Sequence, residues 1–374
     1  MKEKAQKKPQ AEPKAVDSKA ARMAVRLNKK FGAGTFVTFD QASSNIKRWL
    51  DTGNPIINLL MSGNTRLGIP AGRMYEFYGE EQVGKSTMGC LIAASVQHKY
   101  DGLVAIIDTE SAMTKGRAVT LGIKEKSMLY CEEVYVEDIL TQLDAFIALA
   151  GSTPCVIFWD TVAASRSRIN ANRDIGRGRR ADIAAPMSEG LARIAKPLAK
   201  SNTILIACNQ LRHGDIDGNP YRTKREEEST KGGKALKFHA ESRLRFKYIS
   251  DAYRAVKGKK ELQGFIVDIA VTKNKNAPND MSARLYFQTR GPNSGKFNMA
   301  LSCLMTGVRW GCIKKSQTTG RFSFDGVQYA TAKWEKEYDT NQVFHAKVEH
   351  MLQTAYARIT DTAQGAAKQE EEEE

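Results

Sequence analysis

The sequence lacks the features that mark membrane and secreted proteins. No run of about 18 apolar residues could span a bilayer, and residues 1–21 are polar and basic, without the apolar stretch of a signal peptide. None of the six cysteines has CxxC spacing, and several lie in apolar runs. This favours buried, reduced thiols over disulfides or a zinc site. We therefore expect a cytoplasmic protein with no membrane partner.

Acidic residues are also scarce relative to basic ones. The 374 residues include 57 Lys and Arg against 42 Asp and Glu, a formal net charge of +15. Such an excess suggests a polyanionic partner without identifying it. The amino terminus and two internal loops are strongly basic, whereas residues 370–374 are all Glu. That acidic end is either a solvated tail or a segment that competes with nucleic acid for the basic surfaces.

Changes in composition divide the chain into segments. A helix pattern over residues 17–31, capped by Asp17 or Ser18, precedes a short strand at 35–39, which together predict a helix and strand arm. The predicted segments are a disordered basic amino terminus (1–16), the arm with a linker (17–52), a core (53–290), a small α+β domain (291–360) and an acidic disordered tail (361–374).

Within the core, strand-like runs alternate with helix-like segments, which indicates an α/β fold around a mostly parallel sheet. The strand-like runs are 73–78, 103–108, 155–160, 203–209, 242–249 and 264–272. The last two have no helix between them and are predicted to be antiparallel strands at the edge of the sheet. Beyond residue 291 we expect a helix at 297–306, an aromatic strand pair within 321–329 and a final helix at 341–358.

Residues 79–86, with the sequence GEEQVGKS, match the phosphate-binding pattern GxxxxGK[ST] and lie between a strand-like and a helix-like run. Glycines let backbone N–H groups turn toward phosphates, Lys85 adds a mobile cation, and the Ser86 hydroxyl can ligate Mg²⁺. The predicted nucleotide-binding residues are Gly79, Glu80, Glu81, Gln82, Val83, Gly84, Lys85, Ser86 and Thr87. A nucleoside triphosphate is therefore the expected ligand.

Two carboxylates follow apolar strands in the same region. Asp160 ends the run 155–160 and could hold Mg²⁺ through water opposite Ser86, although an Asp in this position is commonly a turn or cap residue. Glu110 follows the run 103–108, and parallel strand ends gather around a ligand at one edge of a sheet. Glu110 is thus a candidate to orient and deprotonate the water that attacks the γ-phosphate, the alternative being a surface glutamate.

Two basic loops, residues 165–180 and 211–231, follow strands that end near the predicted nucleotide. Gln210 directly follows the run 203–209, where its amide could contact the γ-phosphate, and the loop 211–231 comes next. The candidate contacts to DNA are Arg168, Arg173, Arg177, Arg179 and Arg180 in the first loop and Arg212, Tyr221, Arg222, Lys224, Arg225 and Lys231 in the second. Basic side chains neutralise phosphates, and an aromatic ring can stack on bases. Each loop alone could equally be a solvated charge run, but together, beside a nucleotide site, they favour DNA.

Eight motifs follow one another in the order found in the bacterial RecA recombinases, and the similarity covers roughly residues 17–355. These motifs lie at 29–35, 79–86, 106–110, 159–164, 201–203, 209–212, 232–238 and 272–278. The chain therefore resembles the RecA family. The resemblance implies a DNA-dependent ATPase that uses ATP and Mg²⁺, forms a helical homo-oligomer on single-stranded DNA and pairs it with double-stranded DNA. It also implies roles in recombination, DNA repair and the SOS response, with single-strand-binding and mediator proteins as partners.

The resemblance also assigns residues. Glu110 matches the catalytic glutamate, Gln210 the nucleotide sensor, and Lys273 and Lys275 two lysines that reach the γ-phosphate bound by the adjacent subunit; such cations stabilise charge on the transferred phosphoryl group. Without the resemblance, both lysines would be interpreted as surface residues that precede a turn. The residues matched to the subunit interface are Phe36 in the polymerisation arm, Lys237 and Phe238.

Some positions depart from the family pattern. Arg117 occupies the place of the aromatic residue that stacks on adenine, and its guanidinium plane could serve instead. The first loop is richer in arginine than is usual in the family, and the second is longer. On the helix near residues 185–193, some of the family's basic DNA-contact positions are replaced, and Arg193 lies near them. These departures favour a phage-encoded or otherwise specialised member. Two alternatives stay open. One is a hexameric helicase with the same core, and the other is a DNA-binding protein whose nucleotide site only switches its conformation.

Overall fold

The computed structural model describes residues 18–42, 44–168, 183–213, 228–256, 259–291 and 293–373. The chain forms two units, Met1–Asn45 and Ile46–Glu374. The predicted disordered segment 1–16 lies outside the described residues. No helix in the described part of the chain is long and apolar enough to cross a membrane.

In the first unit, helix α1 (Lys19–Phe31) confirms the predicted helix. The Ser18 hydroxyl accepts the Ala21 N–H at 3.1 Å, which satisfies a free amide of the first turn. The helix ends at Gly32, whose φ of 104° suits glycine. None of the residues of α1 is buried, so its apolar side chains stay at least partly exposed.

The predicted strand at 35–39 is wrong. The Asn28 side chain instead binds the backbone of Phe36 from both sides: its Oδ1 accepts the N–H and its Nδ2 donates to the C=O, each at 2.8 Å. A strand needs a neighbouring strand for its backbone groups, and the described residues of this unit contain none. A 3₁₀ helix, η1 (Phe39–Gln41), follows.

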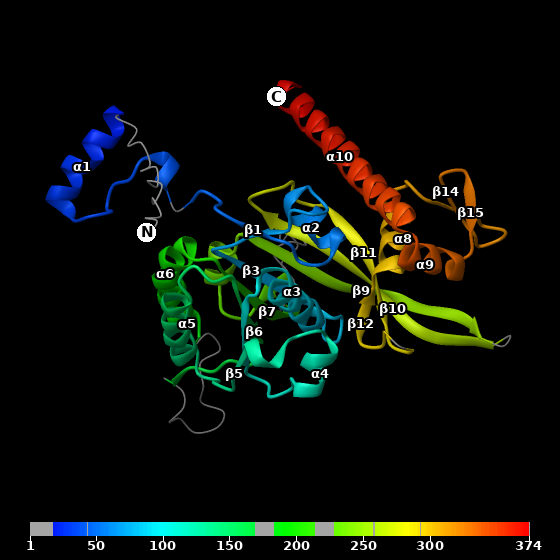
Figure 1. The fold of residues 1–374 in the computed structure, drawn as a ribbon, viewed down its shortest axis with the longest axis horizontal. Helices are drawn as coiled ribbons and strands as arrows, with labels where there is room; N and C mark the ends of the chain where they lie inside the picture. Colours follow the sequence, from blue (N-terminus) through cyan, green and yellow to red (C-terminus); the bar gives the residue numbers. More distant parts are fainter. Residues whose placement is uncertain are drawn as a thin grey trace, which may run out of the picture. The chain divides into compact units, whose positions relative to one another are not determined.

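The second unit is built on a ten-stranded sheet in the order β12-β11-β10-β9-β3-β7-β6-β4-β5, with β8 paired to β7 (Figure 1). Neighbouring strands from β9 to β5 are parallel, and those from β9 to β12 are antiparallel. The strands are β3 (Arg73–Gly79), β4 (Leu103–Asp108), β5 (Met128–Cys131), β6 (Cys155–Asp160), β7 (Thr203–His213), β8 (Glu228–Thr230), β9 (Ser242–Val256), β10 (Lys259–Asn274), β11 (Ser282–Gln288) and β12 (Lys296–Asn298). The predicted α/β class with a mostly parallel sheet is confirmed.

Helices cover both faces of this sheet because the central strands are apolar on both. In β6, Val156 and Phe158 belong to one buried cluster, whereas Ile157 and Trp159 belong to the other. Helices α2 (Pro55–Ser62), α3 (Lys85–Tyr100) and α4 (Lys115–Thr120) contribute to the first cluster; α5 (Val136–Ala150), α6 (Ala184–Lys200) and α7 (Ala235–His239) contribute to the second. A 3₁₀ turn, η2 (Glu125–Ser127), precedes β5, and β1 (Trp49–Leu50) pairs with β2 (Ile69–Pro70).

Strands β9 and β10 confirm the predicted antiparallel pair but correct its place. They lie inside the sheet, because β11 and β12 extend the sheet beyond them. Both strands are also longer than predicted. Beyond the apolar runs, polar residues of the two strands continue to pair in antiparallel fashion, up to Val256 opposite Lys259. Figure 1 shows this hairpin projecting past the other strands.

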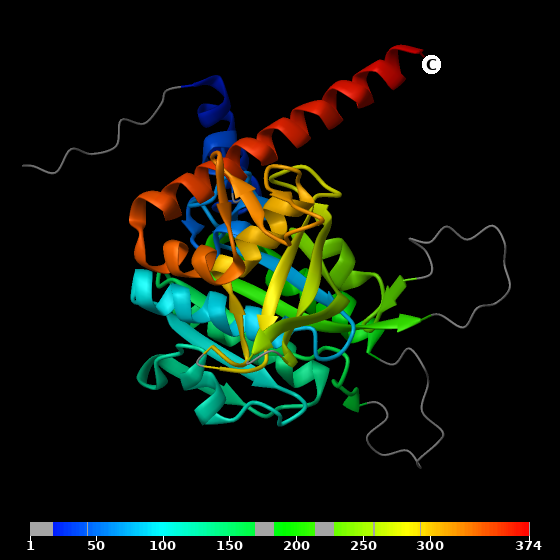
Figure 2. The same cartoon turned by 90° about the vertical axis from the view of Figure 1, so that its right-hand side faces the viewer.

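The region 291–360, predicted as a small α+β domain, lies within the second unit and shares its first apolar cluster. It contains α8 (Met299–Arg309), β13 (Lys314–Lys315), β14 (Phe322–Phe324), β15 (Val327–Tyr329), α9 (Thr331–Thr340) and α10 (Gln342–Glu373). The strand pair within 321–329 is confirmed. Helix α10 continues beyond the predicted helix end through the residues expected to form an acidic tail (Figure 2); this stretch has no Pro and is rich in the strong helix formers Ala, Gln and Glu.

Candidate functional site

The loop between β3 and α3, residues 79–86, depends on two glycines. Gly79 has φ 147°, and a Cβ there would lie 2.0 Å from the Phe246 carbonyl oxygen in β9. Gly84, at φ 90°, is the N-cap of α3, where a Cβ would lie 2.8 Å from the Phe297 ring. Backbone can turn this tightly only without side chains. The amides at the start of α3 then form an anion site.

Lys85 is only 8 % exposed, and its ammonium lies along the same loop. Nζ donates to the carbonyl oxygen of Gly79 at 3.1 Å and to that of Glu80. Burial lowers the pKa of Lys85, while neighbouring acidic groups, Asp160 and Glu110 among them, act in the opposite direction. Phosphate oxygens would give this ammonium charge-assisted partners in place of neutral carbonyls.

Ser86, in the first turn of α3, lies beside Asp160, the last residue of β6. The Ser86 hydroxyl hydrogen-bonds the Asp160 carboxylate; burial raises the pKa of Asp160, and this bond lowers it. A hydroxyl and a carboxylate are oxygen ligands of the kind Mg²⁺ prefers. The described ranges hold no cluster of three or more His, Cys, Asp or Glu that could bind a metal alone, so phosphate oxygens and water would complete the coordination. The residues present fit Mg²⁺ bound with a nucleotide.

The loop that follows β4 carries Glu110. The Asp108 Oδ1 accepts the Glu110 N–H at 3.1 Å, while its Oδ2 accepts the Met113 N–H at 2.7 Å and the Tyr130 hydroxyl at 2.8 Å. Burial raises the pKa of Glu110, and the charges of Asp160 and Asp108 raise it further. A carboxylate with a raised pKa is a stronger base near neutral pH.

A buried polar network lies under the phosphate-binding loop. Register places Gln210 of β7 opposite Gly79, so the predicted sensor is adjacent to the loop. One residue earlier, the Asn209 Nδ2 donates to Glu76 Oε1 at 3.0 Å, and Arg243 of β9 donates to Glu76 Oε2. Sequence reasoning missed Glu76 and Arg243, because only the β9–β3–β7 pairing brings them together.

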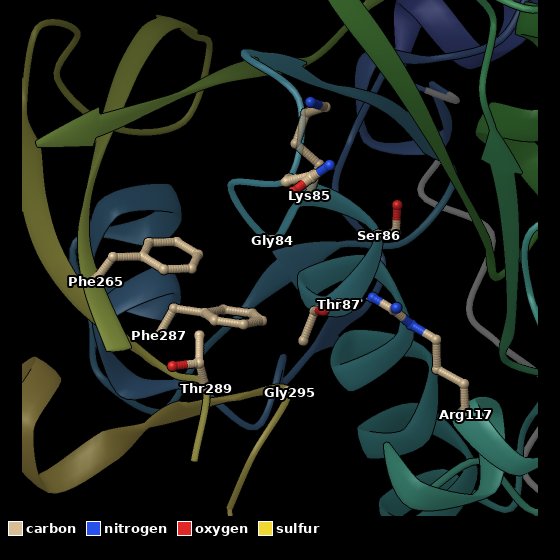
Figure 3. Close-up of a pocket in the computed structure, with 10 residues that line it drawn as sticks. Gly84, Lys85, Ser86, Thr87, Arg117, Phe265, Phe287, Thr289 and Gly295 are labelled. Carbon is tan, nitrogen blue, oxygen red and sulfur yellow. Dashed lines mark hydrogen bonds between the residues drawn. The ribbon is translucent and has the colours of Figure 1, made fainter. Parts of the chain in front are cut away.

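A cavity of about 520 Å³ opens beside the loop (Figure 3). It is lined by Gln82, Gly84, Lys85, Ser86, Thr87, Arg117, Phe265, Phe287, Thr289 and Gly295. Figure 3 shows Arg117 and the two phenylalanines on opposite sides of Thr87. The phenylalanine rings stack with centroids 4.8 Å apart, and an Arg117 guanidinium nitrogen lies 3.4 Å from the Thr87 hydroxyl. Both phenylalanines were missed from sequence, since they come from β10 and β11, far along the chain.

Lys273 and Lys275 lie near the end of α7 rather than along their own phosphate-binding loop. The Lys273 Nζ donates to the carbonyl oxygens of Lys237 at 2.8 Å and Phe238 at 2.9 Å. Burial and the charge of Lys275 lower the pKa of Lys273 to about 8. Lys275 lies 3.5 Å from Glu241. The Phe238 side chain is 74 % exposed, so this corner presents an aromatic ring and two cations at the surface.

The two basic loops leave the ends of β6 and β7, which are adjacent strands. Arg173, Arg177, Arg179, Arg180, Tyr221, Arg222, Lys224 and Arg225 lie outside the described residues, as does the side chain of Arg212. At the described ends, Lys231 Nζ donates to the carbonyl oxygens of Ala163 and Ser165 and so joins the bases of both loops. Arg168 donates to Asp138 at 2.7 Å and lies over the Tyr135 ring.

Two further predicted residues lie away from these loops. Arg193 is on α6, 3.4 Å from Asp144. Phe36 belongs to the first unit, where its ring centroid lies 6.0 Å from that of Phe31.

The fold and this site define a P-loop nucleoside triphosphatase. Residues 19–288 match the family model of the RecA N-terminal domain. Protein RecA of Chlorobium chlorochromatii is 32 % identical over 344 residues, covering 89 % of this chain and 90 % of that protein. Protein RecA of Lactococcus lactis subsp. cremoris is 28 % identical over 350 residues, covering 92 % and 85 %. Protein RecA of Ruminococcus albus is 31 % identical over 254 residues, covering 67 % of this chain and 60 % of that protein.

The chain belongs to the RecA family. It is accordingly a DNA-dependent ATPase of recombination and DNA repair.

Proposed function

We propose that this RecA family member hydrolyses ATP with the residues gathered at the carboxyl ends of β3, β4, β6 and β7. The loop 79–86 and Lys85 hold the phosphates, Glu110 deprotonates the attacking water, and Gln210 senses the γ-phosphate. Ser86 and Asp160 hold Mg²⁺, which would neutralise charge on the phosphate oxygens. The observation that carries the proposal is the convergence of Ser86, Asp160 and the Glu110 loop beside one anion site.

The neighbouring subunit completes this site in the proposal. Lys273 and Lys275 supply cations to the γ-phosphate of the adjacent subunit, and Phe238 and Lys237 lie in the contact. The exposed Phe238 ring and the α1 helix without buried residues support such contacts. Supplying cations from a neighbour makes hydrolysis depend on assembly. Phe36 belongs to the arm that docks on the next subunit.

The proposed assembly is a filament on single-stranded DNA that pairs it with homologous double-stranded DNA and exchanges strands. The basic loops hold the DNA phosphates, with Tyr221 able to stack on a base. The proposal includes a cytoplasmic location and cooperation with single-strand-binding and mediator proteins.

The test combines ATP hydrolysis, with and without single-stranded DNA, and negative-stain microscopy under the same conditions. The wild type should show DNA-stimulated turnover and helical filaments. Lys85→Ala should lose both because the phosphates lose their cation. Glu110→Gln should still assemble, with kcat lowered about 10²–10³-fold by the loss of the base. Glu125→Gln, which removes a surface carboxylate paired with Lys115, is the matched control and should behave as wild type.

Other outcomes would redirect the proposal. Normal turnover by Glu110→Gln would remove that residue from the role of base. Closed rings that unwind a tailed duplex would favour the helicase. Absence of ATP turnover in the presence of DNA would leave a DNA-binding protein whose nucleotide site only switches its conformation.

A further inference from the structure

The position of the Glu110 carboxylate depends on the loop that carries it. Within the described part of the chain, no hydrogen bond holds the Glu110 side chain, while its backbone N–H donates to Asp108. The loop 109–113 includes Ser111 at φ 53°, a left-handed conformation that a serine rarely adopts unaided. Contacts outside the loop must therefore hold its backbone.

Asp108 is the centre of these contacts. It is 1 % exposed, and a buried carboxylate is stabilised only when donors surround it. Three donors do so here: the N–H groups of Glu110 and Met113 from the loop, and the hydroxyl of Tyr130 from the neighbouring strand β5. Tyr130 thus links the loop to β5, a strand that carries none of the predicted nucleotide-binding residues.

The Tyr130 hydroxyl is the donor in its bond to Asp108 Oδ2. Burial and the bond to Asp108 raise the pKa of Tyr130 to about 12, so the phenol keeps its proton at neutral pH. The ring itself is 42 % exposed. Removing the hydroxyl alone should therefore cost little packing while leaving an oxygen of a buried carboxylate without one donor.

A second anchor holds the other end of the same loop. The Thr109 N–H donates to the Asp160 carbonyl oxygen at 2.9 Å. The Thr109 hydroxyl donates to the Thr161 carbonyl oxygen at 2.7 Å and accepts the Thr161 N–H at 2.9 Å. This anchor fixes the loop start to β6, close to the residue proposed to hold Mg²⁺. Residues 110–113 lie beyond it and depend on Asp108.

We propose that Tyr130 is a positioning residue for ATP hydrolysis: its hydroxyl fixes the Asp108 carboxylate, which fixes the backbone that presents Glu110 to the attacking water. The inference rests on the proposed role of Glu110 as the base. Tyr130 does not belong to the residues that line the cavity beside the phosphate-binding loop, and it acts through the Asp108 carboxylate and the loop backbone. A small displacement of a base from its reacting partner is enough to reduce turnover.

The direct test is Tyr130→Phe in the full chain, assayed for ATP hydrolysis on single-stranded DNA. We expect kcat to fall about tenfold, as loss of one hydrogen bond to a charged group predicts, with KM for ATP within about twofold because the phosphate-binding loop is untouched. Tyr100→Phe is the matched control. The Tyr100 hydroxyl accepts the Asp51 N–H at 2.9 Å, far from this loop, and its loss should leave both constants unchanged.

A double-mutant cycle with Glu110→Gln separates positioning from a general structural effect. Tyr130→Phe should lower kcat in the wild-type background and have no further effect in Glu110→Gln, since the base it positions is absent. Asp108→Asn should act in the same direction as Tyr130→Phe and more strongly, because the amide nitrogen cannot accept the bonds of whichever carboxylate oxygen it replaces.

Four results would overturn the inference. Wild-type kcat for Tyr130→Phe, alongside a slow Glu110→Gln, would remove Tyr130 and leave the proposed function standing. An equal loss in both backgrounds, or a change in KM alone, would mean that the hydroxyl acts elsewhere. Normal turnover by Glu110→Gln would overturn the base assignment and, with it, the role of Tyr130.

Discussion

Two loops at one edge of the sheet are held in different ways. The phosphate-binding loop, residues 79–86, is fixed by backbone: Gly79 and Gly84 allow close approaches that any side chain would prevent. The glutamate loop, residues 109–113, is fixed by side chains, through Asp108 and Thr109. The first device is a property of local sequence, and the second depends on which strands become neighbours. A motif search can therefore find the phosphate-binding loop, but it cannot find the contacts that hold the glutamate loop.

Burial acts on the charged residue of each loop in opposite directions. It lowers the pKa of Lys85 and raises that of Glu110, because in both cases a buried environment disfavours the charged form. A bound phosphate would therefore stabilise the charged form of Lys85. The carboxylate of Glu110 becomes a stronger base.

The largest expected effect comes from breaking the backbone device. Gly79→Ala places a Cβ against the Phe246 carbonyl oxygen, a backbone atom that cannot rotate away. We expect the free energy of unfolding in urea to fall by about 3 kcal/mol or more, with loss of ATP binding. Gly116→Ala is the control: it lies in α4 with open space around it and should stabilise by about 0.5–1 kcal/mol. Equal effects of the two substitutions would contradict the steric argument.

A smaller effect should follow from breaking the side-chain device. Thr109→Val keeps the shape but removes both hydroxyl bonds to Thr161. We expect about 1–2 kcal/mol less stability and a lower kcat at unchanged KM for ATP, since the loop moves while the phosphate site does not. Thr120→Val, on the exposed face of α4, removes only a bond to the helix backbone and should change stability by less than about 0.5 kcal/mol. A rise in KM would show that the two loops are not independent.

The fold followed from the sequence wherever the determining pattern was local. Apolar runs predicted β3, β4, β6 and β7, and the cap candidates Asp17 and Ser18 marked the start of α1. The strand at 35–39 failed because β-rich composition does not supply a partner strand. The hairpin β9–β10 was misplaced because β11 covers it, and pairing between strands is a long-range choice.

The same division applies to the site. Five residues could be predicted to lie together, because the carboxyl ends of parallel strands meet at one edge of the sheet. They are Lys85, Ser86, Glu110, Asp160 and Gln210. Phe265 and Phe287 were not, since they reach the cavity from antiparallel strands that carry no nucleotide motif. Tyr130 was missed for a related reason: only the pairing of β4 with β5 brings its hydroxyl to Asp108.

The smallest expected effect links the two loops electrostatically. Burial raises the pKa of Glu110 most, and Asp160, Asp108 and Glu81 of the phosphate-binding loop add to it. As pH falls, Glu110 should therefore be protonated at a higher pH than an ordinary glutamate, and kcat/KM, which reports groups of the free enzyme, should fall with it. Glu81→Gln removes one negative neighbour, so the acid limb should move to lower pH. Because Glu81 is exposed, added salt should shrink that shift, whereas Glu125→Gln should produce none. A limb that moved to higher pH would mean that Glu81 acts on Glu110 through loop geometry rather than through charge.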